Sequence, residues 1–217
     1  AGVDLIRRVT GDETHVWSTP LVINKSTGIK FGKSEQGAVW LDPAKTSPTQ
    51  FYQFWINCDD AGVEDYLKIY TLLSKSEIET IMNEHSKNPN QRIAQTRLAK
   101  AVTEIAHGGQ KSADAEAVTE ILTGKRNLGE IGSVIEDLRQ EIACVHTVEN
   151  GSVIEALVDG GLASSKTEAR RFLQNNAISV NGIKTTSESF DKDNFIGGRL
   201  LIRRGKAFKD TVLVELG

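Results

Sequence analysis

Two lysines in a short glycine-rich segment are well suited to chemistry on a phosphate group. The segment reads Gly28-Ile29-Lys30-Phe31-Gly32-Lys33-Ser34. A P-loop needs four residues between its glycines and a helix directly after its Lys-Ser or Lys-Thr pair. This segment has three intervening residues and leads into a strand-like run, so we exclude a P-loop. Taken alone, the pattern predicts a solvated hairpin that carries two lysines.

A second group of functional side chains lies between residues 164 and 182. Ser164 or Ser165 caps a predicted helix, whose start offers free N–H groups and a positive dipole end to a phosphate. Lys166 and Arg170 are four residues apart, so they share one face of that helix. Three asparagines near the following helix-to-strand turn can donate to ribose or to base edges: Asn175, Asn176 and Asn181.

Several basic side chains in this region have more than one interpretation. One of Arg170 and Arg171 can instead be solvated or ion-paired, with Glu168 and Glu155 as candidate partners. The order of these two arginines along the helix does not decide which one faces a ligand. Further along the chain, Arg203 and Arg204 should point apart, because successive strand residues alternate between faces. Lys184, Arg203, Arg204 and Lys206 are candidates to extend the basic surface.

Three regions with different patterns must position these residues. Residues 1–45 predict a short α/β segment, with a helix over Val3–Val9 and strands at 20–23 and 38–41. Residues 46–145 predict an all-α domain, because Ser47-Pro48 is a helix start and Ser74 with Glu77 forms a capping box. In this domain one amphipathic stripe ends at Gly108 and consists of Ile93, Arg97, Leu98, Ala101, Val102 and Ile105.

The last region, residues 151–217, predicts two helices and a small antiparallel sheet. The helices cover 153–158 and 166–175, and the strands cover 178–180, 200–202 and 212–214. Asn181-Gly182 is a strong signal for a tight hairpin turn. The fold class is therefore α+β with several domains.

Composition excludes several classes of protein. The chain has 217 residues, of which 39% are hydrophobic and 25% charged, typical of a globular protein. The sequence contains no run of about 18 apolar residues, so it predicts no membrane span. Cys58 and Cys144 are far apart, which excludes a disulfide scaffold or zinc ribbon and suits a cytoplasmic protein. The four histidines have no metal-ligand spacing, so we expect no metal site.

The net charge of −3 is unevenly distributed. Residues 60–150 carry 10 basic and 15 acidic side chains, whereas residues 151–217 carry 10 and 8. A basic end on an acidic body can mark a nucleic-acid footprint. On charge alone, ordinary variation in surface composition is the favoured explanation, so the assignment of a nucleic-acid footprint depends on the motifs.

Several of these segments together resemble a known family. Lys30–Ser34 is similar to the Lys-Met-Ser-Lys-Ser signature of class I aminoacyl-tRNA synthetases, in the Phe-Gly variant of bacterial tyrosyl-tRNA synthetases. Asp4–Arg8, Ala38–Leu41 and Thr46–Asn57 also resemble these enzymes. Residues 151–217 resemble the αL RNA-binding domain shared by small-subunit ribosomal proteins, pseudouridine synthases and bacterial tyrosyl-tRNA synthetases. The resemblance covers essentially the whole chain.

The resemblance implies roles for named residues. Lys33 would make the main ATP phosphate contact and Lys30 would assist as the second catalytic lysine, with Gly32 and Ser34 completing the ATP-binding loop. Mg²⁺ would accompany the ATP. The RNA-binding residues would be Ser164, Ser165, Lys166, Arg170, Arg171, Asn175, Asn176 and Asn181. The partner would be tRNA-Tyr, bound by a homodimer whose tRNA straddles both subunits.

The chain does not contain the His-Ile-Gly-His-type motif or the tyrosine pocket that such an enzyme also needs. We therefore expect a C-terminal half of the enzyme that does not activate tyrosine alone. Its parts would be a catalytic-domain remnant at 1–45, an anticodon-side helical domain at 46–145 and the αL domain at 151–217. The alternative is a non-enzymatic RNA-binding adaptor built around an αL domain, for which the segment before residue 60 would have no use.

Overall fold

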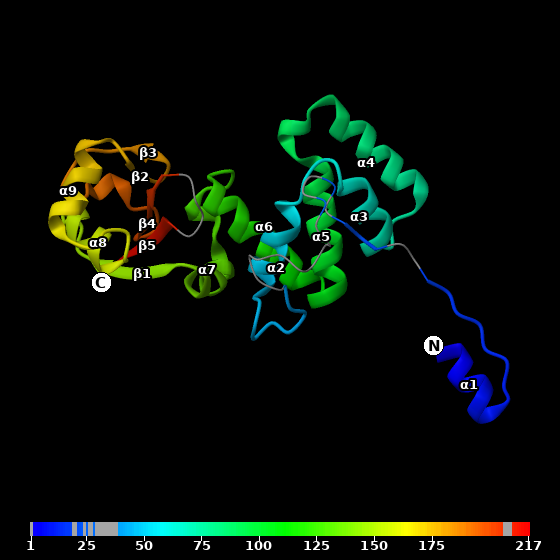
Figure 1. Cartoon of the computed structure of the whole chain (residues 1–217). Helices are drawn as coiled ribbons and strands as arrows, with labels where there is room; N and C mark the ends of the chain where they lie inside the picture. Colours follow the sequence, from blue (N-terminus) through cyan, green and yellow to red (C-terminus); the bar gives the residue numbers. More distant parts are fainter. Residues whose placement is uncertain (1, 19–20, 24, 26–27, 29–38, 206–209) are drawn as a thin grey trace. The chain divides into compact units, whose positions relative to one another are not determined.

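The computed structural model describes residues 2–18, 21–23, 25, 28, 39–205 and 210–217 (Figure 1). The chain divides into two units, Ala1–Ala38 and Val39–Gly217. Within the described residues, helices and one mixed sheet make an α+β fold, as predicted. The three-domain division at 1–45, 46–145 and 151–217 stays a prediction.

The first unit contains helix α1, Gly2–Thr10, at the position that the sequence predicts. The helix ends where Gly11 adopts a φ of 76°. The predicted strand at 20–23 is wrong for its described part, because Leu21 and Val22 lie outside any strand and Ile23 forms only a single bridge. Short apolar runs become strands only when a neighbouring strand pairs with them. For the same reason Val39–Leu41 is irregular in the second unit.

Six helices form the first part of the second unit. They are α2 (Pro48–Ile56), α3 (Val63–Tyr70), α4 (Lys75–Lys87), α5 (Ile93–His107), α6 (Gly109–Thr123) and α7 (Ile135–Glu141). Single 3-10 turns lie at Pro89–Gln91, Leu128–Glu130 and Gly132–Val134. Helix α5 is central, because it packs against α2, α3, α4 and α6.

Local capping chemistry fixes where these helices begin. The Ser47 hydroxyl accepts a hydrogen bond from the Gln50 N–H, and Pro48 occupies the first helical turn. Ser74 and Glu77 form both hydrogen bonds of the predicted capping box. Both predicted helix starts are confirmed.

The buried face of α5 is rotated by about one residue from the predicted stripe. Ile105 is 56% exposed, so its predicted place in the core is wrong. Small and polar residues replace it, and the buried set is Ala94, Gln95, Leu98, Ala99, Val102 and Thr103. Small side chains let α5 approach its neighbours closely, and the side-chain NH2 group of Gln95 donates to the Asp60 carboxylate. Neither effect is visible in apolar periodicity.

The remaining part of the second unit contains a five-stranded sheet with the order β1-β5-β4-β2-β3. The strands are β1 (Ala143–Thr147), β2 (Ile178–Val180), β3 (Ile183–Lys184), β4 (Arg199–Arg204) and β5 (Thr211–Leu216). Two helices, α8 (Val153–Asp159) and α9 (Lys166–Gln174), and a 3-10 turn at Lys192–Asn194 complete it.

The predicted antiparallel sheet needs one correction, because β1 pairs with β5 in parallel. Residues 143–147 are largely exposed, so the sequence shows no buried apolar alternation there. The strand is held instead by backbone pairing along β5. A parallel pair requires a long crossover, and α8, α9 and the other strands supply it.

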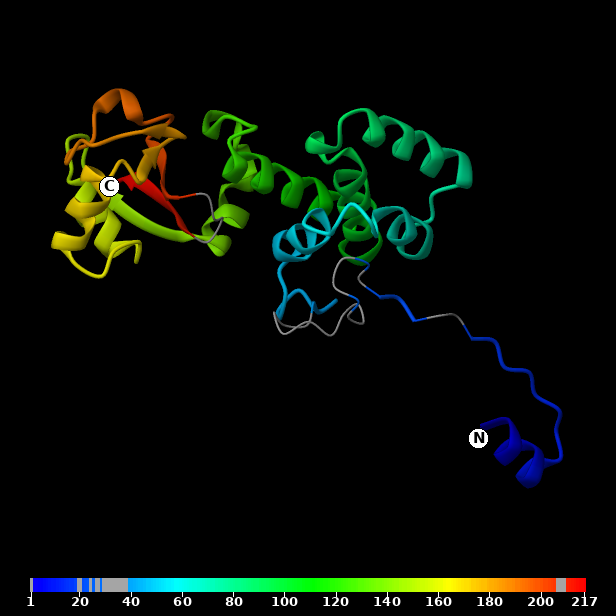
Figure 2. The same ribbon diagram turned by 45° about the horizontal axis from the view of Figure 1, so that its top comes forward.

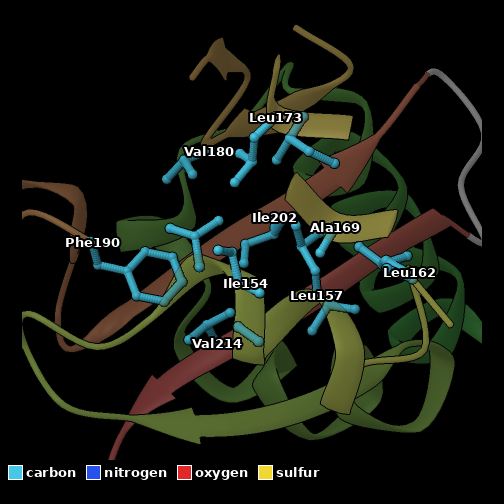
Figure 3. Close-up of a cluster of buried hydrophobic side chains, with 14 of the residues drawn as sticks. Ile154, Leu157, Leu162, Ala169, Leu173, Val180, Phe190, Ile202 and Val214 are labelled. Carbon is cyan, nitrogen blue, oxygen red and sulfur yellow. The ribbon is translucent and has the colours of Figure 1, made fainter. Parts of the chain in front are cut away.

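Strands β4 and β5 are buried on both faces. Leu200, Ile202, Val212 and Val214 face one cluster, which also contains Leu157 and Ala169 from α8 and α9 (Figure 3). Leu201 and Leu213 face the opposite side and join a cluster that includes Val118, Leu122 and Leu138 from α6 and α7. Both ribbon views show α8 and α9 on one side of the sheet and α7 on the other (Figures 1 and 2). The helical part and the sheet therefore share a core.

A buried carboxylate anchors α7 to the sheet. Glu215 is only 5% exposed and accepts hydrogen bonds from Arg139 Nη2 at 2.8 Å and Arg199 Nε at 2.7 Å. Burial acts to raise the pKa of Glu215, but the hydrogen bonds from Arg139, Arg199 and Cys144 outweigh it and lower the pKa to about 2. The charged form of Glu215 thus stabilises the folded state.

Replacing Glu215 tests this anchor. We expect Glu215→Gln to lower the free energy of unfolding by about 3 kcal/mol at pH 7, because two guanidinium groups lose their buried partner. The folded-state pKa lies below the unfolded one. The stabilisation is therefore complete above pH 4.5 and disappears as the pH falls towards about 2.

Urea unfolding of the parent and of the Glu215→Gln variant between pH 7 and pH 2 measures the difference in their free energies of unfolding. The exposed pair of Lys192 and Glu149, 3.3 Å apart, provides the control, and Glu149→Gln should change stability by less than about 1 kcal/mol. A Glu215→Gln effect that is small, or equally large at pH 2 and pH 7, would contradict the anchor.

A close contact at the end of α8 yields a second stability prediction. A Cβ atom added at Gly160 would lie 2.6 Å from Val212 Cγ2, inside the core. Gly160→Ala should therefore destabilise the protein by about 1–3 kcal/mol. Gly109→Ala is the matched control, because its Cβ would meet nothing nearer than Glu104 Oε1 at 3.7 Å. Equal thermal unfolding midpoints for both variants would refute the contact.

Candidate nucleic-acid interface

Both predicted serines build the start of α9. The Ser165 hydroxyl accepts the Glu168 N–H at 3.2 Å and is the N-cap. The Ser164 backbone N–H and hydroxyl donate to Glu168 Oε2 at 2.8 and 2.6 Å. The Ser164 hydrogen bonds lower the pKa of Glu168 and keep it charged. A phosphate at this helix start would compete with the Glu168 carboxylate for Ser164.

Lys166 and Arg170 form an exposed cationic stripe along α9. Lys166 Nζ lies 2.8 Å from Glu155 Oε1 on α8, and Arg170 Nε lies 3.6 Å from Glu188 Oε1. The Lys166 and Arg170 side chains are 59% and 51% exposed. Exposed ion pairs contribute at most about 1 kcal/mol. A polyanion can therefore take the place of Glu155 and Glu188 at little cost.

Arg171 belongs to a different face of α9 from Arg170. Its guanidinium lies 3.5 Å from Glu168 and 5.8 Å from the centre of the Phe172 ring. Arg204, from β4, lies 5.2 Å from the same ring. Arg203 turns to the other side of the strand, where its Nε donates to Thr211 Oγ1 at 3.2 Å. The predicted divergence of Arg203 and Arg204 is confirmed.

The three asparagines have different surroundings. Asn175 is the C-cap of α9, and Asn176 has a φ of 53° in the left-handed region. The side-chain amide of Asn181 donates to the Asn194 carbonyl at 2.7 Å and accepts the Leu201 N–H at 2.9 Å. Asn181 and Gly182 both have positive φ, at 47° and 83°, which confirms the tight turn. Both the NH2 group and the carbonyl oxygen of the Asn181 side chain are thus hydrogen-bonded within the protein.

The predicted ATP loop lies outside the described residues. This applies to Lys30, Gly32, Lys33 and Ser34, of which the structure gives no geometry. Their catalytic and ATP-binding roles stay predictions, as does the Mg²⁺ that would accompany ATP.

One group of side chains brings three metal-ligand types together. The ligand atoms of Cys144, His146 and Glu215 lie within 4.8 Å of one another. The Glu215 oxygens are already held by Arg139 and Arg199, whose positive charges repel a cation. Burial and the hydrogen bond to Glu215 raise the pKa of the Cys144 thiol to about 11, away from the thiolate that a metal needs. These donors do not fit a metal site.

The sequence missed the neighbours that give the α9 side chains their environment. Glu188 and Arg204 lie far along the chain from Arg170 and Phe172, so no local spacing reveals them. Phe172 is only half-buried, packing on the core with one part and contacting two guanidinium groups with another. The alternation along β4 was the one signal that could place Arg204 on the α9 side.

Among the described residues, no helix is long and apolar enough to cross a membrane.

Comparisons with known proteins match two successive regions of the chain. Residues 1–123 match the family described as tRNA synthetases class I (W and Y), and residues 134–211 match the tyrosine–tRNA ligase SYY-like C-terminal domain. A tyrosine–tRNA ligase from Latilactobacillus sakei is 39% identical over 212 residues, covering 95% of this chain and 50% of the relative. Tyrosine–tRNA ligase 2 from Bacillus cereus is 40% identical over 227 residues, covering 100% of this chain and 52% of the relative.

A solved structure of a C-terminally truncated Coccidioides posadasii mitochondrial tyrosyl-tRNA synthetase is 36% identical. The match covers 45% of this chain and 25% of the solved chain, with a TM-score of 0.39. The chain spans about half the length of the curated relatives that it matches. The family match covers more than half of the chain and continues into the SYY-like C-terminal domain. The chain belongs to the tyrosyl-tRNA synthetases, within the class I tRNA synthetases.

Proposed function

We propose that this chain is the tRNA-binding portion of an enzyme that activates tyrosine with ATP and transfers it to tRNA-Tyr. The observation that carries the proposal is the match of both family regions, in order, along one chain. The match before residue 60 argues against the non-enzymatic adaptor, which has no use for that segment. The proposed location of the whole enzyme is the cytoplasm.

The α9 stripe supports the RNA-binding part of this proposal. Lys166 and Arg170 are more than half exposed and are paired with carboxylates that a phosphate can replace. In this account each cation neutralises one phosphate and releases condensed counterions, so binding weakens as salt rises. Recognition would rest on the shape and backbone of the RNA.

The αL domain at 151–217 would contact the anticodon stem and long variable arm, and the helical domain at 46–145 the anticodon side. Ser164, Ser165, Arg171, Asn175 and Asn176 would lie around the stripe. Asn181 would act by shaping the turn, since its amide is already hydrogen-bonded at both ends. The complete enzyme would be a homodimer with tRNA across both subunits.

The lysine loop would serve the activation step. Negative charge develops on the departing pyrophosphate oxygens, and Lys33 with Lys30 would stabilise that charge mainly in the transition state. Gly32 would allow the loop to approach the phosphates closely, and Ser34 would steady it. Mg²⁺ bound with ATP would neutralise further phosphate charge.

Removing the stripe tests the RNA surface. Lys166→Ala combined with Arg170→Ala should weaken tRNA-Tyr binding at least about tenfold, because two phosphate contacts disappear. The slope of log K against log salt should fall by about 2. Gel shifts of the whole chain at several salt concentrations measure both quantities.

The control for the stripe removes its carboxylate partners instead. Glu155→Gln with Glu188→Gln frees the same two cations and should strengthen binding. If the double alanine variant keeps the parent affinity and salt slope, the assigned surface is wrong.

A separate prediction concerns catalysis by this chain alone. Its 217 residues lack the His-Ile-Gly-His-type motif, so we expect no tyrosine-dependent exchange of pyrophosphate into ATP. The measurement compares labelled ATP formation with a blank that lacks protein. A rate above the blank would show that these residues suffice for activation.

A further inference from the structure

A half-buried aromatic ring with two guanidinium groups close to it lies apart from the cationic stripe. Phe172 projects from α9, and part of it packs against the core cluster that contains Ala169 and Leu173. The guanidinium groups of Arg171 and Arg204 lie 5.8 and 5.2 Å from the centre of its ring. Three flat groups from α9 and β4 are thus gathered in one place.

Arg204 is held in a fixed position. Its Nη1 donates to the Leu162 carbonyl at 2.7 Å, and its Nη2 lies 3.1 Å from Asp210 Oδ1. These contacts use two of its N–H donors and hold Arg204 beside the ring rather than extended towards a phosphate. Its guanidinium plane remains beside the ring, and 35% of its side chain is exposed.

Arg171 provides the more open side of the group. Its side chain is 66% exposed, and its contact with Glu168, at 3.5 Å, is long for a hydrogen bond. Glu168 and Asp210 balance the charges of Arg171 and Arg204, so the group has little net charge to attract a phosphate. Planar π surfaces with balanced charge suit stacking better than ion pairing.

We propose that Arg171, Phe172 and Arg204 form a platform on which an unpaired base of the bound RNA stacks. This inference rests on the proposed RNA-binding function and adds a second kind of contact to it. The stripe of Lys166 and Arg170 engages the backbone, and the platform engages a base. Single-stranded or looped RNA offers such bases, and aromatic and arginine side chains are the usual partners that stack on them.

Changing the ring tests the platform. Phe172→Leu keeps an apolar side chain against the core but removes the π surface, so tRNA-Tyr affinity should fall roughly 5- to 150-fold. The salt slope should stay at the parent value, because no phosphate contact is lost. Phe172→Trp should retain most of the affinity. Arg204→Lys keeps the charge but loses the plane and should also weaken binding.

Ultraviolet cross-linking of the unaltered chain to tRNA-Tyr supplies a readout that needs no variant. A stacked base should cross-link to the peptide that contains Phe172, as identified by mass spectrometry. Cross-links confined to other peptides, or a Phe172→Leu variant that binds like the parent, would overturn the platform. A parent chain that does not bind tRNA-Tyr at all would instead sink the proposed function.

Discussion

The alternation of side chains along β4 and β5 sets the packing on both faces of the sheet in the second unit. Because neighbouring residues point to opposite faces, Leu200 and Ile202 must face α8 and α9, whereas Leu201 must face α6 and α7. A shift of one residue in register would exchange the two cores. The same alternation places Arg204 on the α9 side of the sheet and Glu215 on the α7 side. It therefore determines both the core packing and the positions of these charged side chains.

Glu215 shows how a charge is accommodated in such a sheet. Isolation from water opposes its ionisation, and the hydrogen bonds from Arg139 and Arg199 more than offset that opposition. Arg139 comes from a helix 76 residues earlier, so the cluster ties the helical part to the sheet that carries α9. The exposed pairs on α9 lack such burial, which leaves them free to exchange partners with a polyanion.

Sequence reasoning succeeded where structure depends on local chemistry. The caps at Ser47 and Ser74, the Asn181-Gly182 turn and the bounds of α9 all follow from residues within a few positions of one another. It failed where contacts with segments far along the chain determine strand pairing or which face of a helix is buried. Strand β1 is exposed and held by its backbone, and the face of α5 follows from its close neighbours. The environments of Asn181, Phe172 and Glu215 are built by residues that lie 13 to 76 positions away.

We propose that α9 and the loop before it form the surface that binds tRNA. Amide hydrogen exchange of the whole chain, with and without tRNA-Tyr, measures whether this surface is covered. We expect tRNA to slow exchange in residues 162–176 and around Arg204, while exchange in β1, on the far edge of the sheet, changes little. Protection confined to α2–α6, with unchanged exchange throughout α9, would contradict it.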